Sequence, residues 1–379
     1  MCVSLLVLAS SSNEGKKESS FFVKVLLNES KGSNGYSWQL GSTDGFFLSD
    51  TNKDSPIFYL SSKKLVVTFK NNFLYINGKK YLKKQIKIVP KRGDISYNGN
   101  FYQGSFIVVL RKKNSYLVNR VSLEDYIFAV LRSESWPGWP LEVNKVFAVA
   151  IRSYVISKVL EAKKCNRLFH IKNNNSHQTY HGCKFMDRNG KLLRTAVAQT
   201  EGIFLTYAGV PIDAMYDSCC GEVVPAAIEG GVDFKKAPYL ARDYSCDFCK
   251  KCCLYNWQAE YNLSDLEKLL SKEYPGLRKI KSLRVSKKDG AGLVKEVTVR
   301  CSGRSYKIPG EKFYSLLKEV KSFCFSLKKR GNILILKGKG FGHHIGLCQW
   351  GARQMVRELY DYKQILKFYY PGTEFVRLG

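Results

Sequence analysis

The stretch SLEDYIFAVLRSESWPGWPLEVNKVFAVAIRSYV, residues 122–155, decides the architecture of the chain. It contains two runs with the apolar spacing of helices. Between them lies ESWPGWP, whose two prolines and glycine cannot all sit inside one helix. We therefore predict a first helix over 123–131 and a second helix with Pro140 in its first turn. Glu134 lies at the break between the two helices, where a carboxylate can face a cleft rather than open solvent.

The residues around Glu134 suit acid–base chemistry. Trp136 and Trp139 could desolvate its carboxylate and raise its pKa, as a general acid near neutral pH requires. Lys145 and Arg152 are seven residues apart on one face of the second helix, and if close they would lower the same pKa. The alternative interpretation is structural: the glutamate caps a helix and the tryptophans fill a core.

The length and the pattern of the chain define its fold class. A chain of 379 residues is too long for one simple core and fits two or three lobes. Residues 20–110 contain short β-branched and aromatic runs punctuated by Gly, Asn and Pro. We predict an α+β fold, with mixed β-rich lobes and a helical segment that forms a substrate cleft. The expected regions are a β-rich part over 20–110 and a second part over 111–379, which includes a cysteine-rich loop at 235–260.

The chain is strongly basic, with a formal net charge of +29. Such an excess suggests an anionic partner. The lysines are scattered, however, and no zinc-finger, basic-zipper or RNP-type motif is present, so we expect no nucleic-acid partner. An anionic cell-wall polymer and a membrane surface fit the charge equally well, and a lysine-rich source proteome would explain much of it with no partner.

The start of the sequence has features of an export signal. Residues 3–9 are apolar and small residues follow, but the basic segment that opens such signals is missing. We predict a truncated or weak export signal over residues 1–19, and hence an exported protein that is periplasmic or faces the cell wall; the alternative is that this segment is not a signal. No stretch of the sequence is long and apolar enough to span a bilayer.

Cysteine is abundant and clustered. Eight of the 12 cysteines lie between Cys165 and Cys253, and CDFCKKCC at 246–253 resembles a metal-binding knuckle. Disulfides or free thiols are expected in an exported protein and metal ligands in a cytosolic one, and the spacing leaves both open. A second possible zinc site is the loop HIKNNNSHQTYHGC, which carries His170, His177, His181 and Cys183. Zinc is therefore a possible cofactor, and its ligands are unknown at this point.

A glycine-rich loop, GKGFGHHIGLCQWG, lies near the C-terminus. It lacks the ending of a phosphate-binding loop, and its glycines permit close backbone approach to a ligand. His343 and His344 could donate hydrogen bonds there or work with Glu134, and the alternative is that the two histidines are only structural.

Three stretches in order resemble the stage II sporulation protein D family, also called the amidase-enhancer (SpoIID/LytB) family. They are VNRVSLEDYIFAVLRSESWPGWPLEVNKVFAVAIRSYV, TEGIFLTYAGVPIDAMYDSCCGEVV and GKGFGHHIGLCQWGARQMVRELYDYKQILKFYYPGTE. The resemblance runs from about residue 95 to the C-terminus. It implies that residues 111–379 form a SpoIID-like catalytic region.

The resemblance implies a peptidoglycan lytic transglycosylase, which cleaves the bond between N-acetylmuramic acid and N-acetylglucosamine in strands without stem peptides. The family's catalytic glutamate matches Glu134. One carboxylate is enough when the C6 hydroxyl of the sugar attacks C1 and gives a 1,6-anhydro product, whereas a hydrolase usually needs two. The implied partners are peptidoglycan strands and an N-acetylmuramoyl-L-alanine amidase. The implied process is wall remodelling or division.

Further positions match the motifs of the family. Lys145 and Arg152 are expected to orient Glu134 or bind substrate. The other positions expected to line the cleft are Gln178, Tyr180, Tyr216, Ser218, Gly221, His343 and Gln349. Two motifs depart from the family pattern: SCCGE lacks a second glycine, and GHHIGLCQWG has His344 and Cys348 in place of smaller residues. The rival interpretation is a non-catalytic protein that binds peptidoglycan and recruits or stimulates an amidase.

Overall fold

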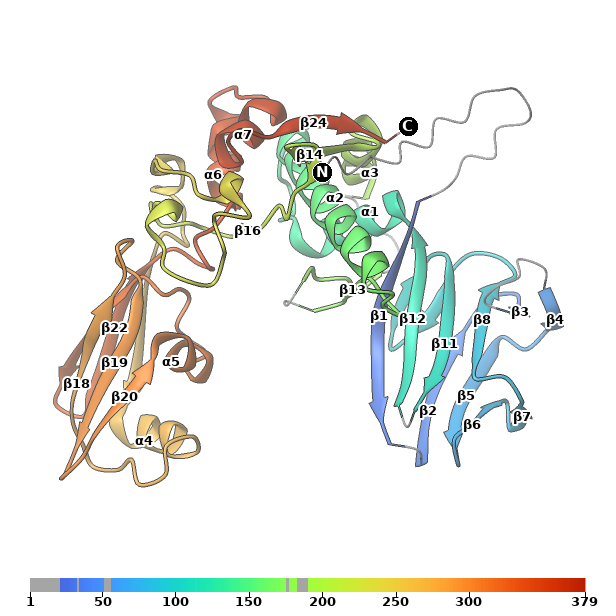
Figure 1. Ribbon diagram of the computed structural model, residues 1–379, viewed down its shortest axis with the longest axis horizontal. Coiled ribbons are helices and arrows are strands. Elements are labelled where there is room, and N and C mark those ends of the chain that lie inside the picture. Colours follow the sequence, from blue (N-terminus) through green and yellow to red (C-terminus); the bar gives the residue numbers. More distant parts are fainter. Residues whose placement is uncertain are drawn as a thin grey trace.

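The computed structural model describes residues 21–378, apart from 33, 51–55, 113, 175–176 and 183–189. The fold is mixed α+β and rich in antiparallel sheet, as the sequence predicts. Two β-rich lobes lie on either side of a helical part (Figure 1). The expected export signal lies outside the described residues. Within the part that is described, no helix is long and apolar enough to cross a bilayer.

The N-terminal lobe consists of two sheets whose buried side chains belong to one core. Buried residues alternate with more exposed ones along the strands, as in β5 (Lys64–Lys70), where Leu65, Val67 and Phe69 point inward. The first sheet has the order β13-β1-β12-β11-β8-β3-β4, with bounds Ile171–Lys172, Phe22–Lys31, Asn114–Ser122, Ser105–Arg111, Gln85–Pro90, Phe46–Ser49 and Pro56–Leu60. The second has the order β10-β9-β2-β5-β6-β7, with bounds Asn100–Tyr102, Ile95–Tyr97, Asn34–Gly41, Lys64–Lys70, Phe73–Ile76 and Lys79–Tyr81.

The helical part begins directly after β12. Helix α1 (Leu123–Glu134) is capped by Ser122, whose hydroxyl accepts the N–H of Asp125 at 3.2 Å. The helix runs three residues beyond the predicted 131, because the helix-breaking residues begin only at Pro137. Helix α2 (Leu141–Lys164) is buried on most of its surface, because α1, α3 (Gly190–Gln199) and the C-terminal elements pack around it.

Segments far apart in sequence meet beside α2. Strand β14 (Ile203–Tyr207) forms a hairpin with β15 (Val210–Pro211) and also pairs with β24 (Glu374–Arg377). Strand β16 (Tyr216–Asp217) runs parallel to β23 (Leu347–Cys348), which leads into α6 (Gln349–Arg357) and α7 (Tyr362–Tyr369). Between them the chain makes three short 3-10 turns, η1 (Pro225–Ala227), η2 (Pro238–Leu240) and η3 (Asp247–Cys249).

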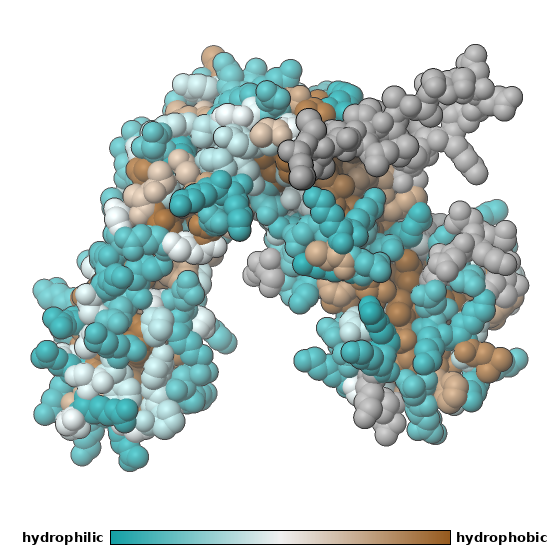
Figure 2. Space-filling view, in the orientation of Figure 1, coloured by the Kyte–Doolittle hydropathy of each residue, from teal (hydrophilic) through white to brown (hydrophobic). Residues whose placement is uncertain are grey.

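The second lobe lies inside the region 111–379 and has a separate core, which includes Leu266, Val297, Phe313 and Leu334. One sheet has the order β17-β22-β21, with bounds Asn256–Asn262, Ile333–Lys339 and Phe325–Arg330. The other has the order β18-β19-β20, with bounds Ile280–Lys288, Val294–Cys301 and Ser305–Pro309. Its helices are α4 (Leu263–Ser271) and α5 (Gly310–Leu316). Figure 2 shows an open hollow between this lobe and the N-terminal lobe, and largely hydrophilic residues on the visible face of the second lobe.

Candidate functional site

A cavity of about 630 Å³ lies where four segments converge: the end of α1, the loop at 177–179, the segment around β16 and the glycine-rich loop. We call this cavity the cleft. Six of the residues that the sequence predicts for the site line it, namely Glu134, Gln178, Tyr216, Ser218, His343 and Gln349. The end of α1 and the break that follows it therefore line the same cleft as two loops from the C-terminal half of the chain.

Glu134 is the last residue of α1 and is half-buried in the cleft wall. Its Oε1 accepts the backbone N–H of Thr179 at 2.7 Å, so a bond from a distant loop fixes the carboxylate. A negative charge at the C-terminal end of a helix opposes the helix dipole and costs about 0.3–1 kcal/mol at the surface. An acid at this position therefore does not stabilise the helix. The side chain of Glu134 binds a distant loop rather than capping α1, so the contacts do not support the interpretation of Glu134 as a helix cap.

A buried asparagine holds the break between α1 and α2. Asn144 donates from Nδ2 to the carbonyl oxygens of Trp139 and Pro140, both at 3.0 Å. Its Oδ1 accepts the hydroxyl of Ser135 at 2.6 Å. These bonds tie the break to the first turn of α2, where the carbonyl oxygen of Pro140 also accepts the backbone N–H of Asn144 at 3.2 Å, and they fix the position of Glu134 next to the break. Asn144 is not among the site residues predicted from the sequence, where its only signal is that a polar residue lies next to the apolar stripe of α2.

Tryptophan rings form the edge of the cleft beside Glu134. Trp136 lines the cleft and is 42% exposed, whereas Trp139 is buried. The two rings stack with centroids 6.3 Å apart, and Trp350 of α6 packs edge-on against both. Trp139 and Trp350 hold the ring of Trp136 in place and leave part of its surface free, so Trp136 is a platform on which a flat ligand face can stack.

Neutral polar groups also line the cleft. Burial lowers the pKa of His343 to about 4, and its Nδ1 accepts the N–H of Ile345 at 3.1 Å, so the neutral ring carries its proton on Nε2. Burial and, after it, the nearby charge of Glu134 raise the pKa of Tyr216 well above its ordinary value. Gln178 accepts the hydroxyl of Tyr126 at 2.9 Å, and its buried Nε2 has no partner among the described residues. The cleft therefore offers neutral hydrogen-bond donors.

Asp217 is the second acid among the described residues that line the cleft, and it is not among the site residues predicted from the sequence. It is buried, and its Oδ2 accepts the backbone N–H of His344 at 2.7 Å. His344 in turn places its ring Nδ1 2.8 Å from the carbonyl oxygen of Cys220. These bonds tie the glycine-rich loop to β16. His344 was one of two histidines that could work with Glu134, and the structure gives it this structural position in the wall.

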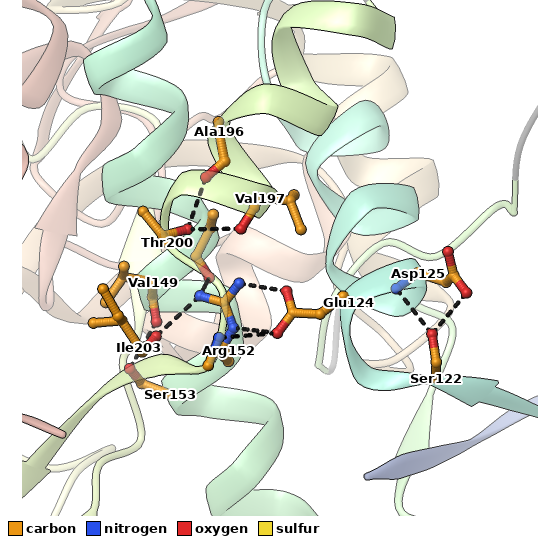
Figure 3. Close-up of polar contacts among 12 residues, drawn as sticks. Ser122, Glu124, Asp125, Val149, Arg152, Ser153, Ala196, Val197, Thr200 and Ile203 are labelled. Atoms are coloured by element: carbon orange, nitrogen blue, oxygen red, sulfur yellow. Dashed lines mark hydrogen bonds and ion pairs between the residues drawn. The ribbon is translucent and has the colours of Figure 1, made fainter. Parts of the chain in front are cut away.

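Four predicted site residues are not among the residues that line the cleft. Arg152 is fully buried and binds Glu124 of α1 through Nη2 at 2.5 Å and Nε at 3.0 Å (Figure 3). Lys145 forms an ion pair with Glu142 at 2.5 Å. Arg152 was expected either to orient Glu134 or to bind substrate. Its contacts fit the first role, because they hold α1, the helix that carries Glu134.

The remaining two residues, Tyr180 and Gly221, lie behind the cleft. Tyr180 is buried, stacks on Tyr126 and donates to Asn119 at 2.5 Å. Gly221 has φ of +60°, and a Cβ there would lie 2.8 Å from the backbone nitrogen of Gly340. Its glycine therefore permits the close approach of the two loops that form the wall.

The structure describes the candidate metal ligands of both sets except Cys183. His170 packs against strand β1, where its Nδ1 accepts the N–H of Lys24 at 3.1 Å, and Cys183 lies outside the described residues. Within the described part of the chain, the histidines of that loop do not come together as a metal-binding group. Four buried cysteines do: Cys220, Cys246, Cys249 and Cys348.

The fold and the cleft define a mixed α+β protein with one half-buried carboxylate in a cleft of neutral donors and an aromatic edge. Comparison with known proteins identifies its relatives. Residues 111–207 match the family described as Stage II sporulation protein (SpoIID), and residues 239–346 match one described as Domain of unknown function (DUF8618). The first match contains α1 and α2, and the second contains most of the cysteine-rich loop and the second lobe.

Similarity extends beyond these segments. An uncharacterized protein of Brachyspira hyodysenteriae is 29% identical over 327 residues, which are 85% of each chain. Stage II sporulation protein D of Bacillus subtilis is 26% identical over 279 residues, 71% of this chain and 78% of that protein. The amidase enhancer of Bacillus subtilis is 26% identical over 290 residues, 64% of this chain and 39% of that protein. The match of residues 111–207 and the relatives named Stage II sporulation protein D and amidase enhancer agree with the family resemblance of the sequence motifs.

Proposed function

We propose that this protein is a peptidoglycan lytic transglycosylase that acts on strands without stem peptides and uses Glu134 as its single catalytic acid and base. The observation that carries the proposal is the position of Glu134: a half-buried carboxylate at the unfavourable end of a helix, held by the N–H of Thr179 and facing the cleft. The match to the SpoIID family supports it.

A glycoside hydrolase uses two carboxylates, and only one of the two acids in the described lining of the cleft is suited to catalysis. Among the described residues of its lining, the acids are Glu134 and Asp217. Burial raises the pKa of Asp217 well above its ordinary value, and one of its oxygens is bound to His344. Asp217 is therefore poorly suited to activate a water. A reaction whose nucleophile belongs to the substrate needs no second carboxylate.

The proposed reaction has two proton transfers through one residue. Protonated Glu134 gives its proton to the oxygen between C1 of N-acetylmuramic acid and C4 of N-acetylglucosamine as the C1–O bond breaks. The C6 hydroxyl of the muramic sugar attacks C1, and the Glu134 carboxylate takes the proton of that hydroxyl. The products are a 1,6-anhydro-muramic end and a free C4 hydroxyl. Glu134 returns to its starting state, and no water is consumed.

Neutral donors suit the binding of sugar hydroxyl and N-acetyl groups. We assign substrate contacts to Gln178, Ser218, His343 and Gln349, and stacking of a sugar face to Trp136. The net charge of +29 suits a wall made of anionic polymers. Action on peptidoglycan places the protein outside the cytoplasm, in the periplasm or facing the wall, in remodelling or division.

The second candidate function is non-catalytic. The match to a protein named amidase enhancer favours a protein that binds peptidoglycan strands and recruits or stimulates an N-acetylmuramoyl-L-alanine amidase. An adaptor of that kind needs a strand-binding cleft but no carboxylate at position 134. Glu134→Gln should therefore abolish the function of a transglycosylase and leave that of an adaptor unchanged.

Digestion of stem-free peptidoglycan strands, followed by mass spectrometry of the products, tests the proposal. The wild-type protein should give anhydro-muramic ends, Glu134→Gln should lose activity at least about a thousand-fold while binding strands as the wild type does, and Glu201→Gln, an exposed glutamate, should be active. Intact strands with the wild type, together with strand binding that does not depend on Glu134, would support the amidase-recruiting function instead.

A further inference from the structure

Four buried cysteines from three separate segments meet behind the cleft. Cys220 follows β16, Cys246 and Cys249 belong to the cysteine-rich loop, and Cys348 ends β23. Their Sγ atoms all lie within 4.8 Å of one another, and those of Cys220 and Cys249 are 3.7 Å apart. Hydrophobic packing alone does not require four sulfurs at one point.

The sulfur spacing fits one tetrahedral metal ion. A disulfide has an S–S distance of about 2.05 Å, far shorter than the 3.7 Å between Cys220 and Cys249. With Zn–S bonds of about 2.3 Å, tetrahedral geometry separates two sulfurs by about 3.8 Å. An iron–sulfur cluster holds its cysteines around a core of several atoms and so needs a wider cage. Four thiolates in a tetrahedron favour zinc.

The surroundings of the sulfurs are those of thiolate ligands. The Sγ of Cys348 accepts the backbone N–H groups of Cys220 and Gly351, both at 3.3 Å, and Cys348 caps the N-terminus of α6, where the helix dipole favours a negative charge. The sulfur of Cys246 is 3.1 Å from the hydroxyl of Tyr369. Gly351 leaves the space, because a Cβ there would lie 2.8 Å from the Cys246 sulfur. Donors around the sulfurs thus stabilise negative charge on them.

We propose that Cys220, Cys246, Cys249 and Cys348 bind one structural zinc ion. All four coordination positions are then protein thiolates, so the ion is closed to substrate and takes no part in the reaction. On binding, the four thiols release their protons to solvent, which makes the affinity rise with pH. The site goes beyond the proposed function and does not depend on it.

The zinc site would join the two sides of the cleft wall. Ser218 lies two residues before Cys220, and Gln349 directly follows Cys348, and both line the cleft. Fixing the two cysteines therefore fixes two of the residues that face the substrate. Cys348 is itself one of the departures from the family pattern, and Cys220 lies two residues before Glu222, the other departure, so each of the two altered motifs holds a ligand of the proposed site.

Metal analysis of the purified full-length chain tests the proposal without any substrate. We expect one zinc per chain in the wild type and in Cys253→Ser, an exposed cysteine of the same loop, and at least a ten-fold loss of zinc affinity in Cys249→Ser. Replacement of zinc by cobalt should give the visible bands of a tetrahedral ion and near-ultraviolet sulfur-to-cobalt charge transfer.

The wild-type protein alone decides the question if Cys249→Ser does not fold. Stoichiometric metal with the tetrahedral sulfur spectrum of cobalt supports the site. Three results would overturn it: no metal bound by reduced protein supplied with zinc, a disulfide between any two of the four cysteines in peptide mapping, or an iron content that replaces zinc. Equal loss of zinc in Cys253→Ser and Cys249→Ser would overturn the ligand assignment.

Discussion

Arg152, in the middle of α2, binds Glu124, in the first turn of α1, with Nη2 2.5 Å from Oε2 and Nε 3.0 Å from Oε1 (Figure 3). The same guanidinium donates from Nη1 to the carbonyl oxygen of Ile203 at 2.9 Å, so it joins α1, α2 and β14. The pair lies at the opposite end of α1 from Glu134. It therefore sets the position of the helix that presents the carboxylate to the cleft.

Arg152→Met should lower the free energy of unfolding by about 3 kcal/mol, because it leaves Glu124 without its partner in a largely buried setting. Denaturation with urea measures the loss. Arg167→Met is the matched control, since Arg167 pairs with Glu161 at 2.9 Å but both side chains are about half exposed, and it should cost less than about 1 kcal/mol. Equal losses of unfolding free energy in the two variants would contradict the proposal that Arg152 holds α1 in position.

Asn144→Asp should destabilise the break between the helices. The carbonyl oxygens of Trp139 and Pro140 lose their Nδ2 donor and gain a carboxylate beside them, at a cost of about 2 kcal/mol. Glycan cleavage should fall more than strand binding, because the altered break displaces Glu134. Thermal unfolding and cleavage assays measure the two effects. Asn71→Asp, on an exposed turn, should change neither stability nor cleavage. If Asn144→Asp also changes neither, Asn144 does not hold the break between the helices.

Trp136→Ala should weaken the binding of glycan strands about five-fold, because it removes a stacking surface from the edge of the cleft. The buried Trp139 supports Trp136, and Trp139→Ala should lower Tm much further than Trp136→Ala does. Titration of strands followed by tryptophan fluorescence or calorimetry gives the affinity. Phe73→Ala, an exposed aromatic residue of the N-terminal lobe, is the control, and a loss of affinity equal to that of Trp136→Ala would refute the assigned stacking.

The free energy of unfolding should decrease as the pH falls from about 6.5 to about 4. Burial lowers the pKa of His170 and of His343 to about 4, whereas a histidine in the unfolded chain titrates near 6.5. Between those values the unfolded chain binds protons that the folded chain does not, so acid favours unfolding. The contribution of these histidines is complete above pH 6.5 and has been lost by about pH 4.

His170→Gln separates this effect from the titration of carboxylates. Because the variant removes one of the two histidines, its free energy of unfolding should fall less steeply over the same pH range than that of the wild type. Denaturation with urea at several pH values gives the slopes. His181→Gln, at an exposed position, should behave as the wild type, and a slope unchanged by His170→Gln would show that burial of this ring does not control the acid response.

The helix–break–helix could be predicted because its signals are local: helical periodicity on both sides and two prolines with a glycine between them. The position of Glu134 followed from the same signals. The membership of Gln178, Tyr216, His343 and Gln349 in one cleft came from motifs rather than from physical periodicity, since these residues come from separate loops.

Other features depend on contacts that no local pattern encodes. Only Cys246 and Cys249 of CDFCKKCC join the four-cysteine group, and their partners lie far away along the chain. Glu222, which stands where the family has glycine, adopts a left-handed φ of 64°. Its ion pair with Lys250 at 2.8 Å and its hydrogen bond from Tyr255 hold that strained conformation. Neither arrangement can be predicted from the sequence without the folded structure of the loop.

In the proposed reaction the sugar itself, activated by Glu134, replaces water as the nucleophile. Digestion of stem-free strands in oxygen-18 water, with mass spectrometry of the new ends, tests it most directly. The proposed reaction predicts anhydro-muramic ends without oxygen-18, formed by the wild type and not by Glu134→Gln. Reducing ends that carry oxygen-18, or identical product patterns from the wild type and Glu134→Gln, would contradict it.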